Sequence, residues 1–197
     1  MKSICVYCGS SKGKNPAYVE AARALAGQMV NKGIGLVYGG GRVGLMGEIA
    51  NEILRLGGEA VGVIPQALMD KEVGHRGLTK LHVVKNMHER KALMAELADG
   101  FIAMPGGIGT FEELFEIFTW FQLGFHTKPI GLLNAAGFYD GLIAFLQHTV
   151  NQGFVQANQA SMLIHEPDAE LLLDRLQTHR PVRIEKVFDE ATAKNIV

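Results

Sequence analysis

The chain has 197 residues, of which 48% are hydrophobic and 20% charged, and its formal net charge is −1. This composition is typical of a globular protein with one sizeable core, and the lack of a basic surplus argues against nucleic-acid binding. No apolar run is long enough to span a membrane, and the N-terminus lacks the features of a secretory signal. We therefore expect a cytoplasmic protein without a membrane partner.

Segments with the pattern of a strand alternate with segments of helical spacing along most of the chain. Strands are predicted at residues 3–8, 34–38, 59–64, 81–84, 100–104, 129–133 and 161–164, and helices at residues 17–31, 45–56, 87–98, 110–123, 138–152 and 168–177. This alternation predicts an α/β protein with a parallel sheet and helices on both faces. Residues 1–180 are predicted to form a single domain, and residues 181–197 a polar C-terminal tail.

The two cysteines, Cys5 and Cys8, form a Cys-x-x-Cys pair inside the first predicted strand. Residues three apart on a strand point to opposite faces, so this spacing favours two separately packed thiols over a redox pair. A zinc site would need two further ligands at suitable spacing, and none is found in the sequence.

The first glycine-rich loop, Gly39–Gly44, matches the pattern G-x-G-x-x-G between a strand and a helix. The pattern fits a phosphate-binding loop and a tight turn equally well. A dinucleotide site is less favoured, because the next strand ends in Val63–Pro65 without the acidic residue that binds the ribose.

The second glycine-rich loop, Pro105–Gly109, follows the strand predicted at 100–104 and opens the helix that runs to Leu123. Its glycines free the backbone to fold around an anion, and the helix N-terminus favours negative charge there. Thr110 and Glu113 also have the spacing of a capping box. From the pattern alone, capping is the stronger interpretation of Glu113.

Arg90 lies on the same predicted helix face as Leu93 and Met94, which are apolar. A cation on a face turned towards the core needs an anionic partner, either a structural carboxylate or a substrate. Neighbouring strand–helix units would bring Arg90, the second glycine loop and Glu113 to one edge of the sheet. Convergence of this kind indicates a ligand site.

Three segments taken together, Tyr38–Gly41, Met87–Lys91 and Pro105–Glu113, resemble the LONELY GUY (LOG) family. Members of this family are cytokinin riboside 5′-monophosphate phosphoribohydrolases, and proteins of this type were long labelled lysine decarboxylases. The resemblance covers nearly all of residues 3–177.

The resemblance implies a Rossmann-like, doubly wound, nucleotide-binding fold and a homodimer with sites near the interface. It implies hydrolysis of an N6-modified adenosine 5′-monophosphate, or of AMP itself, to free base and ribose 5-phosphate without a metal or organic cofactor. The catalytic roles fall to Arg90 and Glu113. The predicted substrate-binding residues are Gly40, Gly41, Glu72, Met87, Lys91, Gly106, Gly107, Ile108, Gly109, Thr110 and Glu112.

In this hypothesis Glu113 stabilises positive charge on the ribose and takes a proton from the attacking water, while Arg90 orients the nucleotide. The alternative function is a non-catalytic carrier of a nucleotide or phosphorylated cofactor, which would not need Arg90 and Glu113 together. An NAD-dependent enzyme that uses the Gly39 loop is a third, less favoured possibility. The aromatic residues of the helix at 110–123 indicate either a subunit interface or a thick core; they are Phe115, Phe118, Trp120 and Phe121.

Overall fold

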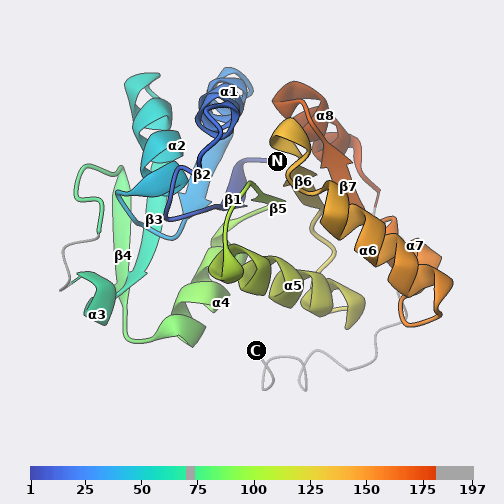
Figure 1. The fold of residues 1–197 in the computed structure, drawn as a ribbon. Coiled ribbons are helices and arrows are strands. Elements are labelled where there is room, and N and C mark those ends of the chain that lie inside the picture. Colours follow the sequence, from blue (N-terminus) through green and yellow to red (C-terminus); the bar gives the residue numbers. More distant parts are fainter. Residues whose placement is uncertain (70–73, 181–197) are drawn as a thin grey trace.

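The computed structural model describes residues 1–69 and 74–180 (Figure 1). Its centre is a seven-stranded sheet in the order β4-β3-β2-β1-β5-β6-β7, and every strand pair is parallel. The strands are β1 (Ser3–Tyr7), β2 (Gly35–Tyr38), β3 (Ala60–Pro65), β4 (Lys80–Val84), β5 (Gly100–Ala103), β6 (Ile130–Leu133) and β7 (Leu163–Glu166). The predicted Rossmann-like, doubly wound sheet is confirmed.

Helices cover both faces of the sheet, as Figure 1 shows. The α-helices are α1 (Ala17–Asn31), α2 (Gly44–Arg55), α3 (Gln66–Met69), α4 (Met87–Leu97), α5 (Ile108–Gln122), α6 (Asp140–Asn151), α7 (Ala157–Ala160) and α8 (Ala169–Thr178), and η1 (Ala135–Gly137) is a 3-10 turn. Helices α1, α2 and α8 pack on one face, and α4, α5 and α6 on the other. None of the helices in the described part of the chain is long and apolar enough to cross a membrane.

The core has two halves because successive strand residues point to opposite faces. In β1, Ile4 and Val6 belong to the half under α1 and α2, whereas Cys5 and Tyr7 belong to the half under α4 and α5. Cys8 lies in the first half, so the two thiols are buried, free and on opposite faces. The prediction of two separately packed thiols is confirmed.

Helix ends follow local sequence signals. Helix α1 is followed by Gly33, whose φ of +66° favours glycine and ends the helix as the sequence predicts. Helix α4 begins at Asn86, whose side-chain oxygen accepts a hydrogen bond from the amide of Glu89 at 2.9 Å. The Glu89 carboxylate accepts one in turn from the amide of Lys85. This cap fixes the first turn of α4, which carries Arg90.

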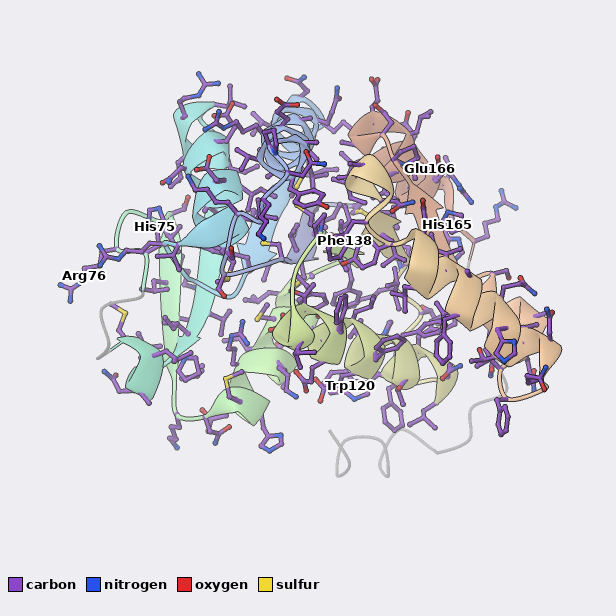
Figure 2. All side chains as sticks on the ribbon, in the orientation of Figure 1. His75, Arg76, Trp120, Phe138, His165 and Glu166 are labelled. Carbon is purple, nitrogen blue, oxygen red and sulfur yellow. The ribbon has the colours of Figure 1, made fainter. Side chains whose placement is uncertain are left out.

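The aromatic side chains of α5 divide between the core and the outer surface. Phe118 and Phe121 are buried, whereas Phe115 is 37% exposed and Trp120 is half-buried on the side away from the sheet (Figure 2). The thick core therefore accounts for two of the four aromatic residues. Phe115 and part of Trp120 remain on the surface.

Candidate active site

A cavity of about 260 Å³ opens where strand order reverses, between β1 and β5. Loops that leave neighbouring strands in opposite directions at such a point create a crevice beyond the carboxyl ends of the strands. The cavity is lined by Cys8, Gly9, Ser10, Met46, Met87, Arg90, Gly107, Ile108, Gly109, Thr110, Glu112 and Glu113. These residues come from the loop after β1, from α2 and α4, and from the start of α5.

The N-terminus of α5 presents unpaired backbone donors to this cavity. Gly107 precedes the helix, no side chain caps it, and its first helical hydrogen bond runs from the amide of Phe111 to the carbonyl of Gly107 at 3.1 Å. The amides of Ile108, Gly109 and Thr110 consequently have no acceptor within the helix. Together with the helix dipole, they form a site suited to an anion.

The capping-box interpretation of Thr110 and Glu113 is wrong. The helix begins at Ile108, two residues earlier than predicted, so Thr110 lies within its first turn and cannot cap it. Glu113 instead pairs with an arginine from α4. The spacing Thr-x-x-Glu occurs inside helices as well as at their starts, so the spacing alone does not identify a cap.

The loops after β1 and β5 meet through glycines. The amide of Gly9 donates to the carbonyl of Pro105 at 3.1 Å. A Cβ on Gly106 would lie 2.9 Å from the amide nitrogen of Gly9, and a Cβ on Gly9 would lie 3.3 Å from the Cα of Gly106. Only residues without side chains allow this approach, which fixes the position of the loop ahead of α5.

Arg90 and Glu113 form a buried ion pair beside the helix N-terminus. Nη1 of Arg90 lies 2.7 Å from Oε1 of Glu113, and the two side chains are only 10% and 11% exposed. Nε of Arg90 also donates to the carbonyl of Val63 in β3 at 3.3 Å. The structure thus brings both predicted catalytic residues to one wall of the cavity.

Burial raises the pKa of the Glu113 carboxyl above its ordinary value, although the neighbouring charge of Arg90 opposes this shift. The direction shows that loss of water outweighs attraction to the guanidinium at this position. A buried carboxylate with a raised pKa and a cationic neighbour is a frequent feature of catalytic sites.

Lys91 joins α4 to α5 but does not line the cavity. Its ammonium lies 2.7 Å from Glu112 and 2.8 Å from Glu116, and its side chain is 13% exposed. These two carboxylates hold the pKa of Lys91 above its ordinary value against the effect of burial. These two salt bridges link α4 to α5 next to the site.

Gly40 and Gly41 lie against β3 and the segment ahead of β4 rather than at the cavity. The carbonyl of Gly40 accepts a hydrogen bond from the amide of His75 at 2.8 Å, and Gly41 forms an isolated antiparallel bridge with Gly74. Neither glycine is among the described residues that line the cavity. Their role in substrate binding stays a prediction.

The first glycine-rich loop packs as a tight turn. The amide of Leu45, in the first turn of α2, already donates to the carbonyl of Gly9 at 3.0 Å. A Cβ on Gly44 would collide with the backbone of Ser10. The loop after β1 thus covers the N-terminus of α2, which favours the tight-turn interpretation and leaves the NAD hypothesis without structural support.

Sequence reasoning missed four residues of the cavity wall: Cys8, Gly9, Ser10 and Met46. A signal was present, because Gly9 and Ser10 directly follow the first strand, where ligand loops of this fold class usually lie. Gly106, which was predicted, lines a neighbouring cavity that shares Gly9, Ser10 and Gly107 with this one. Glu72 and the tail at 181–197 lie outside the described residues.

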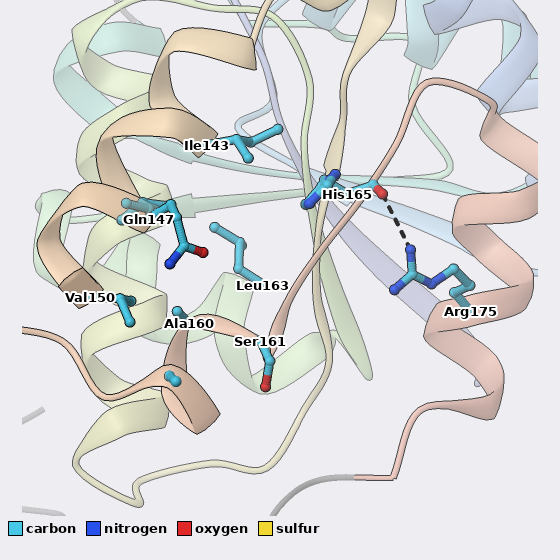
Figure 3. A pocket seen from close by; sticks show the side chains of 10 residues that line it. Ile143, Gln147, Val150, Ala160, Ser161, Leu163, His165 and Arg175 are labelled. Atoms are coloured by element: carbon cyan, nitrogen blue, oxygen red, sulfur yellow. Dashed lines mark hydrogen bonds between the residues drawn. The ribbon is translucent and has the colours of Figure 1, made fainter.

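A second cavity, of about 340 Å³, lies between α6, α7, β7 and α8 (Figure 3). Arg175 is its one cationic side chain among the described residues, and it already pairs with Glu166 and donates to the carbonyl of His165. No glycine is among the described residues that line this cavity, and the helix that begins at its wall, α7 at Ala157, has only four residues. The smaller cavity at α5 is therefore the candidate active site.

The fold and this cavity define a Rossmann-like protein with a candidate ligand site at the switch point of the sheet. A solved structure of a molybdenum cofactor binding protein from Rippkaea orientalis has the same fold, with a TM-score of 0.68 and 18% identity over 90% of this chain and 97% of that one. A family model described as possible lysine decarboxylase matches residues 46–176.

Cytokinin riboside 5′-monophosphate phosphoribohydrolase LOG7 of Arabidopsis thaliana is 46% identical over 98% of this chain and 87% of its own length. The relative named LOG in Oryza sativa subsp. japonica is 47% identical over 91% of this chain and 74% of its own length. The chain belongs to the LOG family.

Proposed function

We propose that the protein hydrolyses the N-glycosidic bond of cytokinin riboside 5′-monophosphates, and of the related nucleotide AMP, to free base and ribose 5-phosphate. The observation that carries the proposal is the buried Arg90–Glu113 pair beside the uncapped N-terminus of α5. The names of the similar plant proteins support the same reaction and substrate class.

The 5′-phosphate would bind at the start of α5. Its oxygens accept hydrogen bonds from the amides of Ile108, Gly109 and Thr110, and the glycine loop allows the group to approach the backbone. Charge-assisted hydrogen bonds of this kind are each worth about 1.5–3 kcal/mol. A nucleoside without the phosphate should therefore be a poor substrate.

The ribose would lie between the phosphate site and Glu113. As the bond from the anomeric carbon to the base nitrogen breaks, its electron pair leaves with the base and positive charge develops on the sugar. The Glu113 carboxylate stabilises that charge and accepts a proton from the attacking water, whose oxygen bonds to the anomeric carbon. The base takes up one proton from solvent as it leaves, Glu113 returns its proton to solvent after the water has added, and Arg90 orients the nucleotide.

The proposal is tested by incubating the purified protein with cytokinin riboside 5′-monophosphates, AMP, other nucleoside monophosphates, the matching nucleosides and the diphosphates. Release of free base from monophosphates alone is the expected result. Tight binding of a monophosphate without release would support the carrier alternative instead. The similarity to the molybdenum cofactor binding protein concerns the fold only.

We also propose that the chain forms a homodimer with its sites near the interface. Ile108 is 83% exposed and Met87 42% exposed at the cavity itself, and Phe115 lies further along α5. Exposed apolar side chains grouped at the rim of a site are typical of a contact surface. The molar mass measured by light scattering after size-exclusion chromatography tests this directly.

A cytoplasmic location is the last part of the proposal. Cys5 and Cys8 are both free thiols, as is usual for proteins of reducing compartments. Fractionation of cells that express the tagged full chain would test it, with recovery in the cytosolic fraction as the expected outcome.

A further inference from the structure

Gly39 lies directly after β2 and next to the guanidinium of Arg90. A Cβ built on Gly39 would come within 3.0 Å of Nη2 of Arg90, closer than Cβ atoms essentially ever approach, and 3.3 Å from its Cζ. The next atom, Sδ of Met46, would be 3.5 Å away, an ordinary van der Waals distance. Among the described neighbours, the side chain of Arg90 is thus the one obstacle to a Cβ at this position.

The backbone conformation of Gly39 does not by itself call for glycine. Its φ lies outside the left-handed region, in contrast to that of Gly40, which is +72°. An alanine at position 39 would fit the local chain without strain. The lack of a side chain at this position therefore serves the arginine and not the turn.

Groups from three parts of the chain surround the guanidinium of Arg90. Nη1 is bound to Glu113 of α5 at 2.7 Å, Nε to the carbonyl of Val63 in β3 at 3.3 Å, and Nη2 lies over Gly39 after β2. Arg90 is 8% exposed in this position. Because the guanidinium is the far end of a flexible side chain, it would give way before the sheet backbone does.

We propose that Gly39 is a positioning residue for the reaction: its bare Cα seats the Arg90 guanidinium so that it holds the Glu113 carboxylate at the sugar. This inference rests on the proposed function. A methyl group at position 39 displaces the guanidinium, lengthens the contact with Glu113 and leaves the two groups out of alignment with the ribose.

The first test compares Gly39→Ala with Gly27→Ala. Gly27 lies within α1, and a Cβ there would meet nothing within 4 Å, so this variant controls for the substitution itself. We expect Gly39→Ala to fold, with a melting temperature lowered because the buried pair with Glu113 is disturbed, and to lose about a hundredfold in kcat, an effect that misplacement by about 1 Å can have. Gly27→Ala should keep full activity.

A double-mutant cycle with Arg90→Lys distinguishes positioning from a general structural effect. Lysine lacks the two terminal nitrogens of the guanidinium, so a methyl group at position 39 no longer meets Nη2, the atom that it approaches most closely in the wild type. Gly39→Ala should therefore change kcat in the wild-type background but leave the residual kcat of Arg90→Lys unchanged. An equal fall in both backgrounds, or full activity of Gly39→Ala, would overturn the inference.

A crystal structure of Gly39→Ala separates this inference from the proposed function. If the wild-type protein releases no base, the proposed function fails, yet the structure still shows whether Arg90 has left Glu113. An ion pair still at its wild-type length in the variant would refute the positioning role. A displaced guanidinium would support it independently of activity.

Discussion

Replacing Glu113 with glutamine removes the charge of this side chain and keeps its shape. In the proposed mechanism the carboxylate faces a sugar that carries close to one positive charge in the transition state. Two opposite unit charges about 4 Å apart interact by roughly 4 kcal/mol at an effective dielectric constant of 20. Loss of that interaction corresponds to a fall in kcat of about a thousandfold.

The same variant should remain folded. Its amide oxygen can still accept a hydrogen bond from Arg90, whose Nη1 lies 2.7 Å from the carboxylate. Because the pKa of Glu113 is raised on folding, the folded protein binds this proton more tightly than the unfolded chain, and stability is lost as pH rises through the raised pKa. Glutamine keeps a hydrogen-bond acceptor for Arg90 but removes its anionic partner, so we expect the melting temperature at pH 7 to fall, though by less than in a variant that also loses the hydrogen bond.

Glu113→Leu serves as the matched control for stability. It leaves the buried guanidinium of Arg90 without its anionic partner, which costs about 3–5 kcal/mol. At about 2–4 °C per kcal/mol for a chain of this size, the melting temperature should fall by about 10 °C. Turnover of AMP or cytokinin nucleotides is measured by base release alongside thermal unfolding. Near-normal turnover by a folded Glu113→Gln protein would refute the assignment of Glu113.

Three further predictions concern other parts of the molecule. Gly106→Ala should raise KM for the nucleotide about tenfold or more through loss of a phosphate hydrogen bond. The new Cβ would collide with the side chain of Thr110 and lie 2.9 Å from the amide nitrogen of Gly9, so the loop would shift. An unchanged KM would contradict the phosphate site. Ile108→Glu should turn the proposed dimer into a monomer in light scattering, because it places a charge on a side chain that is 83% exposed at the proposed contact; an unaltered mass would argue against that surface. Burial lowers the pKa of His126 to about 4 from its ordinary 6.5, and the neutral ring bonds the Ile117 carbonyl through Nε2 and the Lys128 amide through Nδ1. As pH falls, the unfolded chain takes up this proton before the folded protein does, so up to roughly 3 kcal/mol of stability is present above pH 6.5 and lost as pH falls towards 4. The melting temperature should therefore fall more steeply with decreasing pH in the wild type than in His126→Gln, and equal slopes would contradict this.

The long, regular elements were predictable because their signals are local. The apolar runs of β1 to β6 and the helical spacing of α1, α2, α4 and α5 lie within about two residues of the predicted bounds. The short helices α3 and α7 were not predicted, since four residues are too few to show a helical period. The last strand lies at Leu163–Glu166 rather than at 161–164, because α7 and the turn after it occupy the chain as far as Met162.

The glycine loop ahead of α5 was also readable from the sequence, since a strand, three glycines and a helix start follow one another along the chain. The start of α5 was placed two residues late because Gly107 precedes the helix without a side-chain cap. The alternative interpretation of Glu113 as a cap depended on that boundary. The succession of strand–helix units placed Glu113 at the same sheet edge as Arg90, and the family resemblance pointed to its catalytic role.

The sequence by itself determined the alternation of strands and helices, the two-sided sheet, and the positions of the glycine-rich loops. These features depend on residues close together in the chain, whose apolar spacing and glycine content act locally. Only the tertiary structure decided that Arg90 meets Glu113, that the loop after β1 closes over α2, and that Gly39 seats the guanidinium. Such contacts join residues on separate elements, and the packing of those elements against one sheet sets the distances between them.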